Sequence, residues 1–100
     1  MGGPFLVTHA VLRTPDDPVR FGYVISKKVG NAVTRNLLRR RLKGISEELI
    51  RDGIVGADIV FRALPDAATT RYVDLKAEVT RHMERISKWQ HRNREQGQKA

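Results

Sequence analysis

Gly30 and Asn31 divide the first half of the chain into two patterns that need different backbones. Before them, residues 19–29 alternate between two sides, a period typical of a β-strand. After them, apolar residues recur at helical spacing, at Leu38, Leu42, Ile45 and Leu49. Asn31 is a good N-cap and Gly53 can adopt the left-handed conformation that ends a helix, so we predict a helix over 32–51. The chain must therefore combine helix with sheet.

Three further segments complete the predicted fold. Residues 5–13 and 58–64 have strand patterns, and the second is nearly all apolar, so we expect it at the centre of a sheet. Residues 73–90 carry apolar residues at helical spacing. This order predicts one α/β (α+β) domain over 1–90, a two-layer sandwich in which helices pack on a small mixed sheet. We expect residues 91–100, which are polar and aperiodic, to form a disordered tail.

The connections suggest how the strands are arranged. Residues 14–18 form a short turn with two prolines, and we expect the strands on either side of it to be antiparallel. The helix over 32–51 would place the strands before and after it in one sheet, and a parallel pair is one arrangement that this allows. Such connections are right-handed in most proteins.

The formal net charge of +8 comes from one stretch of the chain. Residues 18–46 contain no Asp or Glu, and the other 11 Lys and Arg residues are matched by 11 Asp and Glu. The basic residues of this stretch are Arg20, Lys27, Lys28, Arg35, Arg39, Arg40, Arg41 and Lys43. Such a block either contacts a polyanion or forms a solvated face.

The predicted helix arranges part of this block as a ridge. Arg35, Arg39 and Lys43 follow one another at i, i+4 and i+8, with Asn36 beside them. Like charges at this spacing repel by a few tenths of a kcal/mol per pair. We therefore favour an anionic partner over a solvated face, with nucleic acid as the first choice and an anionic membrane surface as the second.

Aromatic side chains of the first two strands form a second candidate surface, at Phe5, His9, Phe21 and Tyr23. On an open sheet face such rings can stack on unpaired bases. The same pattern is also that of an ordinary core beneath a helix, and the residues alone favour the core.

Other chemistries have little support in the residues. There is no cysteine, so neither a disulfide nor a thiolate metal site can form, which fits a reducing cytoplasm. The three histidines do not have metal-ligand spacing, and the acidic residues form no cluster. No apolar run is long enough to span a membrane. We therefore expect no catalytic residue, no metal site and no membrane association.

The run RFGYVISKKVGNAVTRNLLRRRLKG, residues 20–44, resembles the protein component of bacterial ribonuclease P, the RNR-motif family. The family pattern is a strand ending in SKKxGxAVxRNxxKRxxRE. The positions that match it or substitute conservatively are Ser26, Lys27, Lys28, Gly30, Ala32, Val33, Arg35, Asn36, Arg39, Arg40 and Lys43. The resemblance continues through ADIVFRALP and the final helix.

The resemblance implies a small basic protein whose RNR-motif helix lies in an unusual left-handed crossover. The family protein joins a large catalytic RNA, which with Mg²⁺ hydrolyses a phosphodiester of precursor tRNA to leave the mature 5′ end. Catalysis and most of the Mg²⁺ binding belong to the RNA, and the protein improves binding of the single-stranded 5′ leader. The chain would thus be a cytoplasmic ribonuclease P subunit with no obligate protein partner.

The basic block and the resemblance together predict two sets of site residues. RNA contacts are expected at Lys27, Lys28, Asn31, Arg35, Asn36, Arg39, Arg40, Arg41 and Lys43. His9, Phe21 and Tyr23 would line the cleft that holds the leader.

Three features depart from the family pattern. The family usually has a helix with aromatic residues before the first strand, whereas this chain begins at the strand, so we expect either a truncated start or a cleft that is open on that side. Leu37 stands where a basic residue is common, and Gly44 where Glu is common. The alternative function is a ribosomal-type or regulatory RNA-binding protein with no part in catalysis. A helix-turn-helix DNA-binding factor comes third, because the preceding helix and short turn are missing.

Overall fold

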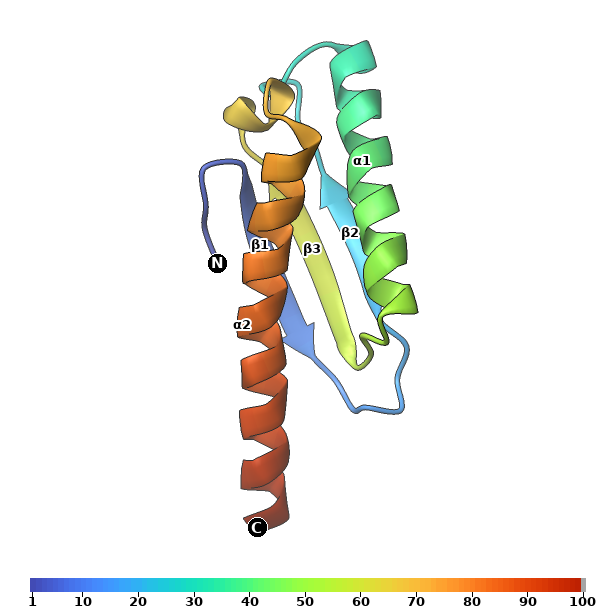
Figure 1. Cartoon of the computed structure of the whole chain (residues 1–100), viewed down its shortest axis with the longest axis vertical. Helices are drawn as coiled ribbons and strands as arrows, with labels where there is room; N and C mark the ends of the chain where they lie inside the picture. Colours follow the sequence, from blue (N-terminus) through green and yellow to red (C-terminus); the bar gives the residue numbers. More distant parts are fainter. Residues whose placement is uncertain (100) are drawn as a thin grey trace.

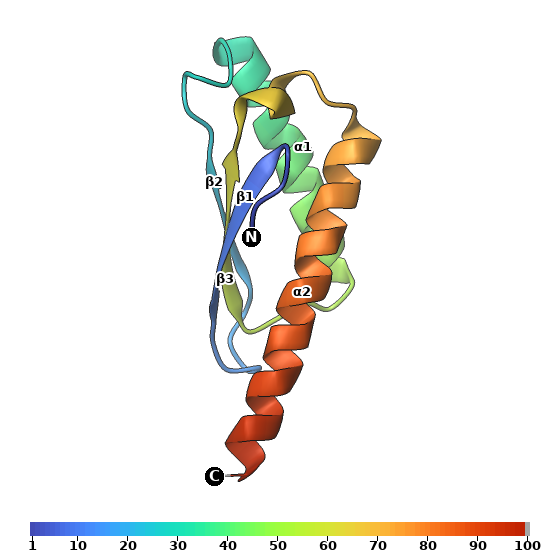
Figure 2. The ribbon, with the colours of Figure 1, turned by 90° about the vertical axis from the view of Figure 1, so that its left-hand side faces the viewer.

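The computed structural model describes the backbone of residues 1–99 and the side chains of residues 1–92. Its elements are β1 (Leu6–Leu12), β2 (Arg20–Val24), α1 (Ala32–Arg51), β3 (Ala57–Ala63), the short 3-10 helix η1 (Pro65–Ala68) and α2 (Tyr72–Lys99). Both long helices lie on one face of the sheet, and neither covers the other face (Figure 1, Figure 2). The predicted two-layer α+β sandwich is confirmed.

The last strand in sequence is the central strand of the sheet. The strand order is β1-β3-β2. β3 pairs antiparallel with β1, with Leu6 opposite Ala63, and parallel with β2, with Arg20 opposite Asp58. The central place of β3 and its parallel pairing through the helical connection agree with the sequence. β1 and β2 run in opposite directions, as predicted, but they are not neighbours, because β3 lies between them.

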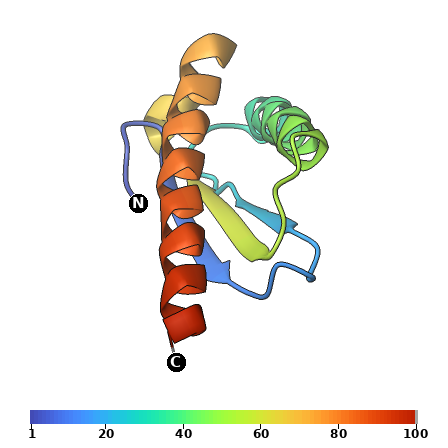
Figure 3. The same cartoon turned by 60° about the horizontal axis from the view of Figure 1, so that its bottom comes forward.

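The connection from β2 through α1 to β3 is left-handed. In Figure 1, β2 and β3 both point upward and β3 lies to the left of β2. Figure 2 places α1 on the side of the sheet that faces the viewer of Figure 1. The chain thus departs from the general right-handed tendency and follows the handedness that the resemblance implies. Figure 3 shows the result, with α1 over β2 and α2 over β1.

The core lies between the helical layer and the sheet. α1 contributes Leu38, Leu42 and Ile45, α2 contributes Leu75, Val79, Met83 and Ile86, and the sheet contributes Leu6, Ile59 and Phe61, all buried. The ring of Phe61 stacks with those of Phe21 and Tyr23, at centroid distances of 6.0 and 6.4 Å. Each large apolar side chain buried here contributes roughly 1.5 to 3 kcal/mol.

Local capping sets both ends of α1 where the sequence predicts them. The Asn31 side chain accepts a hydrogen bond from the Thr34 N–H at 2.9 Å, which satisfies one of the free donors of the first turn. At the other end, Gly53 has a φ of 95°, a conformation that an L side chain rarely adopts. The predicted helix over 32–51 matches Ala32–Arg51 at both ends.

The second long helix extends further than the sequence suggests. The prediction is a helix over 73–90 followed by a disordered tail, but α2 spans Tyr72–Lys99. The backbone of residues 91–99 is therefore helical, and Ala100 lies outside the described residues. Arg, Gln, Glu and Lys, which dominate this segment, are good helix formers, and no proline interrupts them. A segment without apolar periodicity has no face to pack on the core, but it can still be helical.

Candidate nucleic-acid interface

α1 presents its basic ridge, formed by Arg35, Arg39 and Lys43, on one side of the helix. Arg39 and Lys43 are exposed, as is Asn36 beside them, whereas Arg35 is half-buried. At about 100° per residue, Arg39 lies on nearly the opposite side of the helix from Arg41. Arg41 is on the side that faces α2, because its guanidinium donates to the Thr70 carbonyl at 3.3 Å. The ridge therefore projects away from α2, beside the edge strand β2.

The charges of the ridge are not neutralised within the described part of the chain. No ion pair there involves Arg39, Arg40 or Lys43. The Nε of Arg35 is buried and has no hydrogen-bond partner among the described atoms. These cations are held close together by the helix while their counter-charges are absent. This arrangement favours an external polyanion.

The turn before α1 adds two more cations. β2 ends at Val24, earlier than the predicted strand over 19–29, and a turn then brings the chain to the helix. The Val29 N–H donates to the Ser26 carbonyl at 3.1 Å, and the buried Val29 side chain anchors the turn. Lys27 and Lys28 are both exposed on it. They thus stand near the start of α1, whose free N–H groups favour an anion.

Two predicted RNA contacts already have structural partners. Asn31 uses its side-chain oxygen to cap α1, so only its amide NH₂ is available to a ligand. Arg41 is half-buried and bonded to Thr70, away from the ridge. Of the predicted basic contacts, the fold therefore groups Lys27, Lys28, Arg35, Arg39, Arg40 and Lys43, with Asn36, and sets Arg41 apart.

The prediction that His9, Phe21 and Tyr23 share one face of the sheet is wrong. The hydroxyl of Tyr23 donates to Ser46 on α1 at 2.8 Å, so this side chain points into the helical layer. Phe21, two residues away, shares that side and stacks on buried Phe61. His9 pairs in register with Val60, next to buried Phe61 on β3, and so points to the opposite side. Phe21 and Tyr23 are core residues at the edge of the helical layer, and His9 alone lies on the face without helices.

That helix-free face has members that the sequence prediction missed. The register aligns Val7 of β1, Arg62 of β3 and Val24 of β2 in one row across the sheet. His9, Val60 and Gly22 form the next row. Arg62, His9 and Val24 are exposed. The sequence offers a signal for Val60 and Arg62. Successive side chains of a strand point to opposite faces, so the two neighbours of the buried Phe61 must lie on the face away from the core. The face thus combines the apolar side chains of Val7, Val24 and Val60 with the imidazole of His9 and the cation of Arg62.

One end of the helix-free face carries an internally neutralised cluster. Asp58 accepts from Arg20 at 2.8 Å and from Arg13 at 3.2 Å. The hydrogen bond from Arg20 is the main cause that lowers the pKa of Asp58, and Asp58 in turn raises the pKa of Arg20. Arg20 is therefore committed to Asp58. Arg62 carries the positive charge that this face can offer to a ligand.

The described residues offer no site of their own for a metal ion. They contain no group of three or more His, Cys, Asp or Glu side chains placed to hold one. In the same residues, no helix has the length and apolar character needed to cross a membrane.

Comparisons with known proteins identify the family of the chain. The family model for ribonuclease P matches residues 1–87. The ribonuclease P protein component of Clavibacter michiganensis subsp. michiganensis is 52% identical over 71 residues, which cover 70% of this chain and 63% of that protein. The chain thus spans less than two thirds of the length of that relative.

Solved structures show the same fold. The ribonuclease P protein of Staphylococcus aureus superimposes with a TM-score of 0.72 at 25% identity, over 88% of this chain and 79% of that one. The ribonuclease P protein of Thermotoga maritima gives a TM-score of 0.74 at 20% identity, over 85% of this chain and 80% of that one. With its basic crossover helix, its left-handed topology and a family match over most of its length, the chain belongs to the bacterial ribonuclease P protein family.

Proposed function

We propose that this chain is the protein subunit of ribonuclease P and acts by binding two RNA segments. The basic ridge and the exposed lysines of the preceding turn contact the catalytic RNA. The helix-free face of the sheet holds the single-stranded 5′ leader of precursor tRNA. The observation that carries the proposal is that these two surfaces meet at the end of β2, where Lys28 of the turn before α1 lines one groove with Val24 and Arg62 of the helix-free face. A bound leader could therefore pass directly from one surface to the other.

The chemical step belongs to the RNA in this proposal. The described residues contain no set of carboxylates for Mg²⁺, so we place the Mg²⁺ that supports phosphodiester hydrolysis on the RNA. The contribution of the protein is electrostatic. Ridge cations lower the repulsion between two polyanions, which raises substrate affinity and reduces the Mg²⁺ concentration needed for activity. We further propose that residues 1–90 act as one RNA-binding domain and that the protein works in the cytoplasm.

Reconstitution tests the proposal. The chain is added to bacterial ribonuclease P RNA at low Mg²⁺, and cleavage of precursor tRNA to the mature 5′ end is followed. We expect faster cleavage and tighter substrate binding than with RNA alone, and no cleavage by the chain alone. Substrates with a long and a short leader separate the two surfaces, because only the long leader can occupy the sheet face.

The outcome also separates the alternative function. A ribosomal-type or regulatory RNA-binding protein would bind RNA without increasing cleavage at any Mg²⁺ concentration. RNA binding with no gain in cleavage or substrate affinity would therefore overturn the assignment as a ribonuclease P subunit. The ridge could still bind RNA in that case.

A further inference from the structure

α2 carries a second set of basic residues, which the proposed function does not use. Arg81, Arg85, Lys88 and Arg92 follow one another at spacings of four, three and four residues, so they form one row along the helix. All four are exposed. At a rise of 1.5 Å per residue the row is about 16 Å long. We call these four residues the α2 row.

Among the described side chains, most of the acidic residues that form ion pairs do so outside the row. By sequence, Lys and Arg outside the first basic block are balanced by Asp and Glu. In the folded chain, four acidic residues form ion pairs with cations outside the row. Asp17 and Asp58 pair with Arg13, Asp58 also pairs with Arg20, Asp74 pairs with Arg71, and Glu48 pairs with Lys76. No ion pair among the described side chains involves Arg85 or Lys88.

Two acidic residues with described side chains, Glu78 and Glu84, lie beside the row. Glu78 is buried, and its carboxylate accepts hydrogen bonds from the backbone N–H groups of Leu6 and Phe5. The distance from its Oε1 to the Nη2 of Arg81 is 4.0 Å, which is long for an ion pair. Glu84 makes no ion pair in the part of the chain whose side chains are described. The described part of this surface therefore has an excess of positive charge, with the four cations of the row against these two carboxylates.

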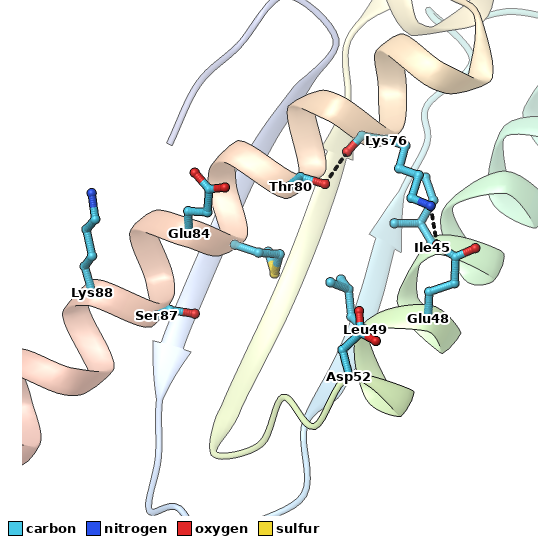
Figure 4. Close-up of a pocket in the computed structure, with 10 residues that line it drawn as sticks. Ile45, Glu48, Leu49, Asp52, Lys76, Thr80, Glu84, Ser87 and Lys88 are labelled. Atoms are coloured by element: carbon cyan, nitrogen blue, oxygen red, sulfur yellow. Dashed lines mark hydrogen bonds and ion pairs between the residues drawn. The ribbon is translucent and has the colours of Figure 1, made fainter.

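Two members of the row, Arg81 and Arg85, lie on the flank of α2 that faces the N-terminal segment. There, a groove of about 370 Å³ lies between α2 and the N-terminal segment, and three cations, Arg81, Arg85 and Lys88, line it together with two carboxylates, Glu78 and Glu84. On the other flank, a groove of about 520 Å³ lies between α2 and α1, where Lys76 pairs with Glu48 at 2.8 Å. Lys88 also lines this second groove, at its far end from Lys76 (Figure 4). The α2 row is thus a separate surface from the basic ridge.

An aromatic ring stands within the row. Trp89 is four residues after Arg85 and three before Arg92, so it lies between them on the same side of α2. Its exposed fraction is 42%, although it is the largest apolar side chain of the protein. Exposed aromatic rings flanked by arginine are the combination that binds single-stranded nucleic acid, with phosphates on the cations and a base on the ring.

We propose that the α2 row and Trp89 form a second binding site for single-stranded RNA, independent of the ridge and of the helix-free sheet face. A membrane is a poorer partner for this surface. An interfacial helix inserts its apolar side into the lipid, but the apolar stripe of α2, Leu75, Val79, Met83 and Ile86, is buried against the sheet. Electrostatic attraction with one stacked base fits RNA better.

Trp89 supplies the measurement, because it is the only tryptophan of the chain. The ridge is first silenced with Arg39→Ala and Lys43→Ala, and short oligouridylate is titrated while tryptophan fluorescence is followed. We expect quenching that saturates. Adding Arg85→Gln and Arg92→Gln should weaken binding and lower the slope of log K against log salt by about 0.7 for each phosphate that is no longer bound. A control is Arg71→Gln, which removes a cation that stands just before α2 and already pairs with Asp74.

A second pair of variants tests the stacking. With a labelled oligouridylate followed by anisotropy, Trp89→Leu should weaken binding about tenfold and Trp89→Phe much less, because phenylalanine still stacks. Circular dichroism checks that each variant folds. The proposal is overturned if the Arg85→Gln and Arg92→Gln variant keeps the same salt slope, or if Arg71→Gln has an equal effect. Quenching by phosphatidylserine vesicles but not by oligouridylate would also overturn it. These binding measurements do not depend on whether the chain increases cleavage by ribonuclease P RNA, so the two proposals can fail separately.

Discussion

The hydroxyl oxygen of Thr8 and the Nδ1 of His82 lie 2.6 Å apart, within hydrogen-bond distance, and join β1 to α2. Both side chains are almost fully buried, with exposed fractions of 1% and 4%. One helical turn before His82, the carboxylate of Glu78 accepts the Leu6 N–H at 2.6 Å. The contact between the first strand and the last helix is therefore polar at its centre, although apolar packing surrounds it.

The burial of His82 predicts a pH-dependent stability. Burial is the main cause that lowers its pKa from 6.5, and the positive charges of the N-terminal amine, Arg85 and Arg81 lower it further. The unfolded chain therefore binds the proton at a higher pH than the folded protein. The contribution is fully present above about pH 6.5 and is lost as the pH falls through the lower folded pKa.

Urea unfolding at pH 7.5, 6.0 and 5.0 measures this effect. The free energy of unfolding should fall over this series, and the His82→Gln variant should show a smaller fall. An equal fall in both proteins would assign the pH dependence to other groups.

The hydrogen bond between Thr8 and His82 can be tested on its own. Thr8→Val keeps the shape of the side chain but leaves a buried imidazole nitrogen without its partner, so we expect a loss of about 1 to 3 kcal/mol in the free energy of unfolding. The control is Thr80→Val, whose hydroxyl is exposed and bonds only to the Lys76 carbonyl of its own helix. This second change should stay within about 0.5 kcal/mol.

The helix-free face predicts a leader-dependent defect. His9→Ala and Arg62→Gln together should weaken binding of precursor tRNA to the reconstituted enzyme and leave binding of mature tRNA unchanged, since only the precursor carries a leader. Equilibrium binding of both RNAs measures the difference. An equal loss for the two RNAs would place these residues on another part of the substrate.

A variant at Tyr23 tests the assignment of the leader to the helix-free face, because this side chain lies on the other face. Tyr23→Phe removes the hydrogen bond to Ser46 and should lower the free energy of unfolding by about 1 kcal/mol. The ring remains in the core, so the preference for precursor over mature tRNA should not change. A loss of that preference without a loss of stability would show that the hydroxyl contacts the leader.

The ridge predicts a salt effect. Arg39→Ala with Lys43→Ala should reduce the affinity for the catalytic RNA and lower the slope of log K against log salt by roughly 0.7 to 0.9 for each phosphate that the variant no longer binds. Filter binding over a range of salt concentrations measures the slope. An unchanged slope would mean that the ridge is a solvated face and does not bind phosphates.

The features that the sequence predicts correctly depend on local interactions. Asn31 and Gly53 end α1 by backbone geometry within a few residues, so both ends are predictable. The central position of β3 follows from its nearly complete apolar character. The basic ridge follows from helical spacing alone.

The features that the sequence does not reveal depend on pairing between distant segments. Alternation shows which residues of one strand share a face, but not which faces of two strands coincide. The sequence therefore groups His9 with Phe21 and Tyr23, although the pairing of β1 and β2 with β3 puts them on opposite faces. The buried polar contacts of Glu78 and His82 escape prediction for the same reason, since their partners lie more than 70 positions away.

The strand order also has a consequence for how the protein is made. β1 and β2 each pair only with β3 among the described strands, so neither can form a sheet until residues 57–63 have been synthesised. Until then a nascent chain holds two unpaired strands and a helix with a row of uncompensated cations. Such intermediates expose strand edges and are prone to aggregate.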